Sequence, residues 1–145
     1  MRLLLPALAA LATATAANAA PQVQAAWSRP AAAGTTGAGF MVLANPSKTP
    51  DALVFATSPL AREVQIHQSR MVGGVASMQR LDRVPLPPGS RVTFGPGGYH
   101  LMLMGLKAPL QTGEAVPVIL VFASGAKVEA AFVVGLAPPA GHAHH

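Results

Sequence analysis

The chain has 145 residues, a formal net charge of +5 and no cysteine. Its length fits a single domain. The absence of cysteine excludes disulfides, thiolate nucleophiles, Cys-ligated zinc and blue-copper centres, which need a Cys ligand. The basic residues are scattered singly with few aromatic residues between them, so the pattern argues against a nucleic-acid partner. At most it gives a weak preference for an acidic protein partner.

The first 19 residues have the three-part pattern of a secretory signal peptide. Arg2 supplies the positive charge, residues 3–11 are apolar, and Ala17-Asn18-Ala19 is a small-residue cleavage signal. The apolar run is too short and too rich in alanine to span a bilayer, and a buried N-terminal helix is the less favoured alternative. We therefore expect cleavage after Ala19 and a periplasmic mature protein with no membrane span.

Short segments rich in β-branched residues, separated by Gly and Pro, follow the signal sequence, and none has a convincing helical period. The pattern predicts an all-β sandwich or barrel over residues 20–136, with no substantial helix. Residues 85–89 are interpreted as a turn-rich connection, and residues 137–145 as a disordered, histidine-containing tail. The expected strands cover residues 23–27, 39–43, 51–58, 62–70, 75–81, 91–94, 99–103, 115–122 and 127–134.

Two histidines and two methionines in the middle of the chain are the candidate metal ligands. If Gly73-Gly74 forms a two-residue hairpin loop, His67 and Met78 become diagonal neighbours on one face of the hairpin. His100 and Met102 lie two positions apart, so one strand presents both on one face while Leu101 and Leu103 point into the core. The hairpin and a third strand can therefore bring four donors together.

The chemistry of these four side chains indicates the metal. Thioether sulfur is soft and uncharged, and imidazole is borderline, so a set without carboxylate or thiolate favours Cu(I) over zinc, iron or calcium. Imidazole binds a metal only when neutral, so affinity is expected to fall below a pH of about 6.5. Met71 and Met104 lie nearby and are interpreted as core filler.

The spacing H-x10-M-x21-H-x-M, formed by His67, Met78, His100 and Met102, resembles the signature of the PCu(A)C family of periplasmic copper chaperones. The surrounding segments AAWSRP, VQIH, GGV and PGGYHLMLMGLK resemble that family as well, whereas the QSR after the first histidine is more polar than its pattern. The resemblance covers residues 23–134. It implies a Greek-key, cupredoxin-like β-sandwich that binds Cu(I) at an exposed site through these four side chains.

The resemblance also implies that the protein delivers copper to the CuA centre of cytochrome c oxidase, alone or with a Sco-type thiol protein. Some family members carry His/Met-rich tails that take up Cu(II). His142, His144 and His145 are accordingly a candidate weak Cu(II) site, and the alternative is that these histidines are incidental.

Three other functions are alternatives to copper delivery. General copper scavenging or buffering would use the same ligands. A metalloenzyme or electron-transfer protein is less favoured, because cysteine is absent and the five carboxylates are dispersed. A structural or adhesion domain would make the histidines and methionines incidental, which the specific spacing argues against. We therefore expect a non-enzymatic copper carrier.

Overall fold

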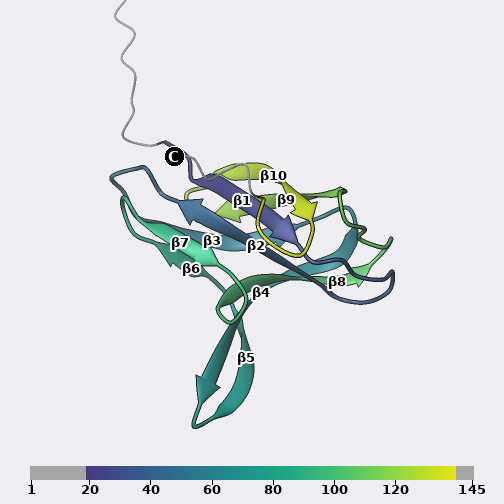
Figure 1. Ribbon diagram of the computed structural model, residues 1–145. Coiled ribbons are helices and arrows are strands. Elements are labelled where there is room, and N and C mark those ends of the chain that lie inside the picture. The colour runs from purple at the N-terminus through teal and green to yellow at the C-terminus, as the bar shows by residue number, and fades with distance from the viewer. Residues whose placement is uncertain (1–18, 140–145) are drawn as a thin grey trace, which may run out of the picture.

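The structure is a computed structural model that describes residues 19–139, and all regular structure within them is β-strand (Figure 1). The predicted all-β fold class is confirmed. The predicted signal peptide, residues 1–19, lies outside the described residues except for residue 19, and so do the tail histidines of the Cu(II) prediction. The strands are β1 (Gln22–Ser28), β2 (Gly37–Ala44), β3 (Asp51–Thr57), β4 (Ala61–Val72), β5 (Val75–Leu81), β6 (Val84–Leu86), β7 (Arg91–Phe94), β8 (Tyr99–Leu106), β9 (Ala115–Phe122) and β10 (Lys127–Val134).

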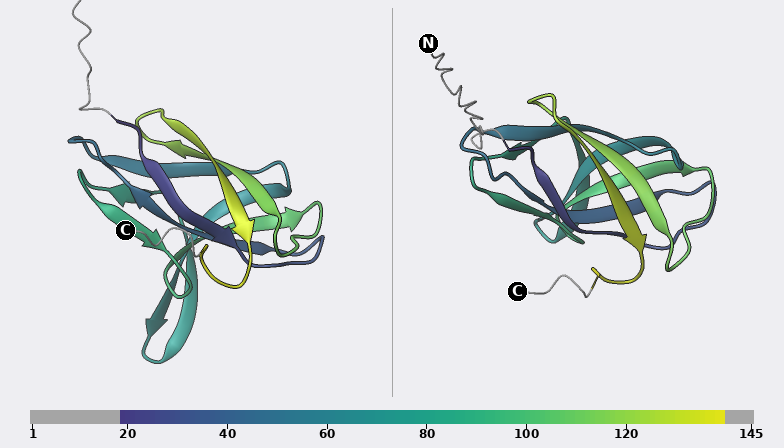
Figure 2. Two further views of the ribbon diagram at one scale, coloured as in Figure 1. Left: turned by 45° about the horizontal axis from the view of Figure 1, so that its top comes forward. Right: turned by 90° about the horizontal axis from the view of Figure 1, so that it is seen from above.

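The strands form one continuous sheet in the order β5-β4-β8-β7-β2-β1-β10-β9-β3-β6. This sheet coils on itself, so that β3 and β4 contact each other although they are not paired. The two views of Figure 2 show the strands surrounding a common interior. β1 runs parallel to β10, and β2 pairs with both β7 and β8. Within residues 19–139 no helix could cross a membrane.

The interior is filled by the apolar residues that alternate along each strand. On β8, Leu101 and Leu103 are fully buried, and on β4 Val64 and Ile66 face the same core. Phe94, Phe122 and Phe132 are its largest fully buried aromatic side chains. Each such side chain contributes about 1.5–3 kcal/mol by leaving water. The core therefore fixes which face of β4 and β8 turns inward, and the opposite face, here called the outer face, carries the candidate ligands.

The strand β6 was not predicted, and the assignment of residues 85–89 to a turn is wrong in its first part. β6 pairs with β3, and its Val84 and Leu86 are buried while Pro85 is exposed. Proline cannot donate to a strand ladder, so it is tolerated here because β6 is the last strand of the sheet. A three-residue strand centred on proline is too short for its alternation to be recognised.

The β4–β5 hairpin projects from the body as an arm (Figures 1 and 2). β4 pairs with β8 only as far as Gln68, and beyond it pairs with β5 alone. The turn residues Gly73 and Gly74 have φ values of 58° and 81°, as a type I′ turn requires. The predicted register is confirmed, because Val72 pairs with Val75 and Ser69 with Met78. Residues 69–78 are called the arm below.

Replacing Gly74 with alanine is expected to loosen the arm and leave the body unchanged. A Cβ at Gly74 would meet no atom within 4 Å, so the cost arises only from the left-handed backbone. That cost is about 1–2 kcal/mol. Amide hydrogen exchange along β5 should quicken about tenfold, while exchange in β8 and β9 stays the same. Gly95→Ala is the control, because Gly95 has no positive φ and equally open surroundings. Equal exchange in both variants would contradict the turn assignment.

Candidate metal centre

β8 supplies His100 and Met102 from its outer face. Leu101 and Leu103 occupy the core, so strand alternation turns their neighbours His100 and Met102 the other way. His100 is nevertheless only 5% exposed, whereas Met102 is partly exposed. The strand therefore holds one deeply placed imidazole and one more accessible thioether on the same face. The sequence predicted the shared face but not the burial of His100.

β4 places His67 directly opposite His100. The two residues are cross-strand partners in the antiparallel β4–β8 ladder, and their ring centroids lie 5.9 Å apart with the planes tilted by 43°. The next outer-face pair along the ladder is Gln65 with Met102. Two imidazoles at this separation are close enough to share one metal ion, since metal–imidazole bonds are about 2 Å long.

β5 contributes Met78 from the arm. Met78 pairs with Ser69, so it lies diagonally next to His67 on the outer face. Its side chain is 55% exposed, in contrast to the buried His100. The structure thus brings the four predicted residues to one face of three adjacent strands, with Met78 on the solvent side.

The hydrogen bonds of the two histidines leave one nitrogen of each ring available. Nδ1 of His100 lies 3.1 Å from the carbonyl oxygen of Gly98, to which it can donate, and this leaves Nε2 as the open nitrogen. Nε2 of His67 lies 2.9 Å from Oε1 of Gln65 and donates to it. Nδ1 of His67 is buried and has no hydrogen-bond partner within residues 19–139. A buried nitrogen without a partner fits a ligand position, because such an atom is otherwise costly.

A short polar chain fixes the orientation of Gln65. Its Nε2 donates to Oε2 of Glu63 at 3.2 Å, so its Oε1 is directed to the imidazole of His67. Oε2 of Glu63 also lies 3.8 Å from a guanidinium nitrogen of Arg80, in a largely exposed ion pair. Gln65 and Glu63 are not among the residues that the sequence predicted for the site. Their positions two and four residues before His67 were the available signal, because strand alternation puts all three on one face.

The surroundings of His67 favour its neutral form. Burial lowers the pKa of His67 below its ordinary value of 6.5, and electrostatic repulsion from His100 and Arg80 lowers the pKa further. A neutral imidazole is the form that coordinates a metal. The imidazole of His67 therefore stays neutral to a lower pH than that of an ordinary histidine.

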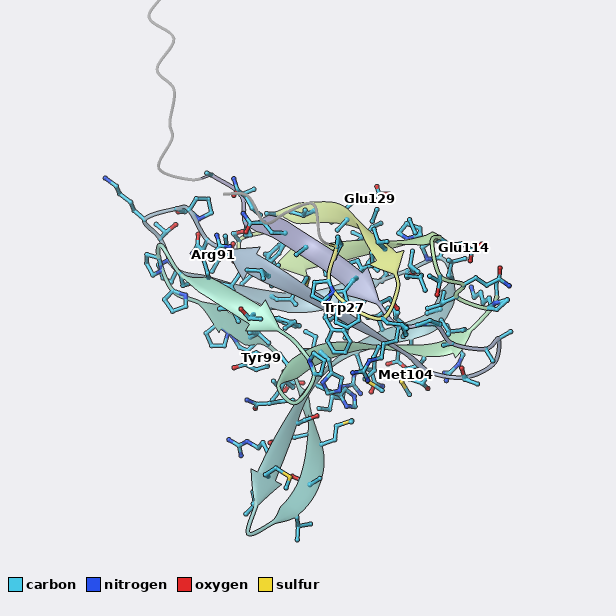
Figure 3. The ribbon with its side chains drawn as sticks, viewed as in Figure 1. Trp27, Arg91, Tyr99, Met104, Glu114 and Glu129 are labelled. Carbon is cyan, nitrogen blue, oxygen red and sulfur yellow. The ribbon has the colours of Figure 1, made fainter. Side chains whose placement is uncertain are left out.

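Aromatic side chains cover the inner end of the site. The ring of Phe40 lies 6.5 Å from that of His100, and Trp27 packs on Phe40 with centroids 4.7 Å apart. The guanidinium of Arg29 lies over the Phe40 ring at 5.3 Å. Figure 3 shows Trp27 and Met104 on the side of the body from which the arm projects. This cover explains why His100 is buried although it lies on the outer face.

The other possible metal donors of the chain include its carboxylates and the methionines Met71 and Met104. Within the described residues, no group of three or more His, Asp or Glu side chains is placed to hold a metal ion. Met104 continues the outer face of β8 and is partly exposed. Met71 is 70% exposed on the arm, so its interpretation as core filler is wrong. The β4–β8 ladder ends at Gln68, so β4 has left the body of the fold before it reaches Met71, which a short apolar pattern does not reveal.

Comparison with known proteins identifies the relatives of this chain. The LpqE-like family, described as "Putative lipoprotein LpqE-like", matches residues 21–134. The chain belongs to the LpqE-like family. Among its curated relatives, "Putative lipoprotein Lxx21020" of Leifsonia xyli subsp. xyli is 39% identical over 105 residues, which are 72% of this chain. The chain spans 63% of the length of that relative.

Solved structures extend the comparison of this LpqE-like chain. The copper-bound PCuAC domain from PmoF2 is 30% identical with a TM-score of 0.67, and the match covers 81% of this chain and 93% of that domain. The Cu(I) form of DR1885 from Deinococcus radiodurans is 33% identical with a TM-score of 0.60, covering 77% of each chain. The predicted relationship to the PCu(A)C family and its fold is confirmed.

In this LpqE-like chain, His67 is expected to titrate below pH 6.5 in the metal-free protein, because burial and its cationic neighbours disfavour the imidazolium. Imidazole NMR signals followed against pH give the midpoint, and a His67→Gln variant assigns them. Arg80→Gln should move the midpoint upward, because one repelling charge is removed. A midpoint at or above 6.5 in the unaltered protein would contradict the described surroundings of His67.

Proposed function

We propose that this protein binds one Cu(I) ion through His67, Met78, His100 and Met102 and carries it to an acceptor protein. The observation that supports this most directly is the pair of open nitrogens on adjacent strands. Nδ1 of His67 is buried without a hydrogen-bond partner in the described part of the chain, and the opposing His100 uses Nδ1 internally and keeps Nε2 available. Two thioethers share the same face.

The donor set favours copper in the +1 state. Two imidazoles and two thioethers are neutral and soft to borderline, which suits Cu(I) better than zinc, iron or calcium. The nearest outer-face carboxylate on β4, Glu63, is engaged by Gln65 and Arg80. The names of the PmoF2 and DR1885 structures state bound copper and Cu(I), and this supports the same cargo here.

The accessibility of the ligands suits transfer better than permanent storage. His100 is buried, whereas the Met78 side chain is half exposed on the projecting arm. An acceptor ligand can therefore approach the ion from the Met78 side without unfolding the sheet. Neutral thioethers also release Cu(I) more readily than a thiolate cage would. We propose a non-enzymatic carrier on these grounds.

The same proposal extends to the export of the protein, its domain boundaries and its copper acceptor. Residues 1–19 would direct export to the periplasm as a cleaved signal peptide, residues 20–136 would form the copper domain, and residues 137–145 a tail with a weaker Cu(II) site. The acceptor would be the CuA subunit of cytochrome c oxidase or a Sco-type protein. General copper buffering is the second candidate, because the same half-open site would also suit it.

Loss of a single ligand is expected to weaken Cu(I) binding at least about tenfold, which corresponds to about 1.4 kcal/mol. The test is a competition titration of the apo protein with a Cu(I) chelator, comparing Met78→Leu and His67→Gln with the unaltered protein. Leucine keeps the volume of methionine and removes the sulfur. Met104→Leu is the matched control, and its affinity should not change. Unaltered affinity in both ligand variants would sink the proposal.

Delivery is tested separately from binding. Cu(I)-loaded protein is mixed with the apo CuA domain of cytochrome c oxidase, and the purple absorbance of the assembled centre is followed after exposure to air. Delivery predicts that the absorbance appears, because the half-exposed Met78 side admits the acceptor ligands, and that apo protein with no copper gives none. Copper that stays with the loaded protein would instead favour buffering or another acceptor.

A further inference from the structure

A further thioether, that of Met71, lies on the outer face, on the arm beyond the proposed site. Met71 pairs with Ala76, and Met78 pairs with Ser69. Met71 and Met78 are therefore diagonal neighbours, with backbones about 7–8 Å apart, within reach of two long side chains. Met78 has the same diagonal relation to His67 on its other side, because His67 pairs with Arg80. Met78 thus lies between His67 and Met71.

Exposure rises steadily in the same direction. His100 is 5% exposed, Met78 is 55% exposed and Met71 is 70% exposed. β8 no longer pairs with β4 beyond Gln68, so Met71 lies on a two-stranded ribbon that solvent reaches from both sides. Donors of increasing accessibility therefore lead from the buried end of the site to the arm.

The position of Met71 is not explained by packing. It lies outside the hydrophobic core, and an exposed methionine gains little from burial where it stands. The other exposed apolar residues of the arm, Val72 and Val75, pair with each other at the turn and offer no metal donor. Met71 is the arm residue that adds a soft donor next to Met78.

We propose that Met71 is a transfer ligand that binds Cu(I) transiently as the ion leaves the site. This inference rests on the proposed function and names a further step of it. Met78 keeps its Cu–S bond while a Cu–S bond to Met71 forms and the bonds to His67, His100 and Met102 break. The copper stays in the +1 state, and the neutral imidazoles and the Met102 thioether leave with their electron pairs, so no electron needs to move. The ion is then held by two exposed thioethers, with room for an acceptor ligand.

The test separates the rate of release from the strength of binding. Cu(I)-loaded protein is mixed with excess bathocuproine disulfonate in a stopped-flow instrument, and formation of the coloured chelate is followed. Met71→Leu should slow release about fivefold while changing Cu(I) affinity less than about twofold. Leucine retains the apolar side chain and removes only the sulfur, and the exposure of Met71 makes misfolding of this variant a minor concern.

Met104→Leu is the matched control. Met104 lies four residues after His100, as Met71 lies four residues after His67, and both are on the outer face. Met104 pairs with Glu63, at the end of the ladder opposite to the arm. Its replacement should leave both rate and affinity unchanged.

Each other outcome has a defined meaning. Release at the unaltered rate in Met71→Leu would overturn the inference. If release slowed in Met71→Ala but not in Met71→Leu, the inference would also be overturned, because an apolar contact of the side chain and not its sulfur would then control the rate. A tenfold loss of affinity in Met71→Leu would make Met71 a permanent ligand and would also overturn it. If His67→Gln and Met78→Leu bind Cu(I) normally, the proposed function itself has failed.

Discussion

β4 forms backbone ladders on both of its edges, with β8 on one side and β5 on the other. This double pairing decides which side chains meet. Side chains alternate along a strand, so a slip of one residue in either ladder would turn a histidine or a methionine to the opposite face. Val64 and Ile66 on β4 and Leu101 and Leu103 on β8 are buried, and they oppose a slip in the β4–β8 ladder because it would turn one of these two pairs out of the core. The register of the hydrophobic core and the geometry of the site are therefore one constraint.

The sequence predicted the parts of this arrangement that depend on local rules. Gly73-Gly74 indicated a two-residue turn, and strand alternation then placed Met78 beside His67. Alternation also paired His100 with Met102 on one face. The neighbour of β4 on its other edge could not be predicted in the same way, because β8 is far away in the sequence and its pairing depends on the whole fold. That pairing is what puts His67 opposite His100.

Side-chain contacts within the site could not be predicted from the sequence either. The orientation of Gln65 depends on its hydrogen bond to Glu63, and the burial of His100 depends on Phe40 from β2. Neither contact follows from spacing along the chain. The exposure of Met71 could not be predicted, because it depends on where the ladder with β8 stops. Strand β6 could not be predicted, because it has only three residues.

The pairing of His67 with His100 joins distant parts of the chain, and it makes the donor set a property of the folded protein alone. In the unfolded chain the hairpin donors and the β8 donors are separated by flexible backbone, so gathering them around one ion costs the entropy of closing that loop. An ion that prefers the folded state stabilises it by the difference in affinity between the two states. The proposed Cu(I) binding would therefore couple loading to folding, and a chain that lost its copper would also lose part of its resistance to unfolding.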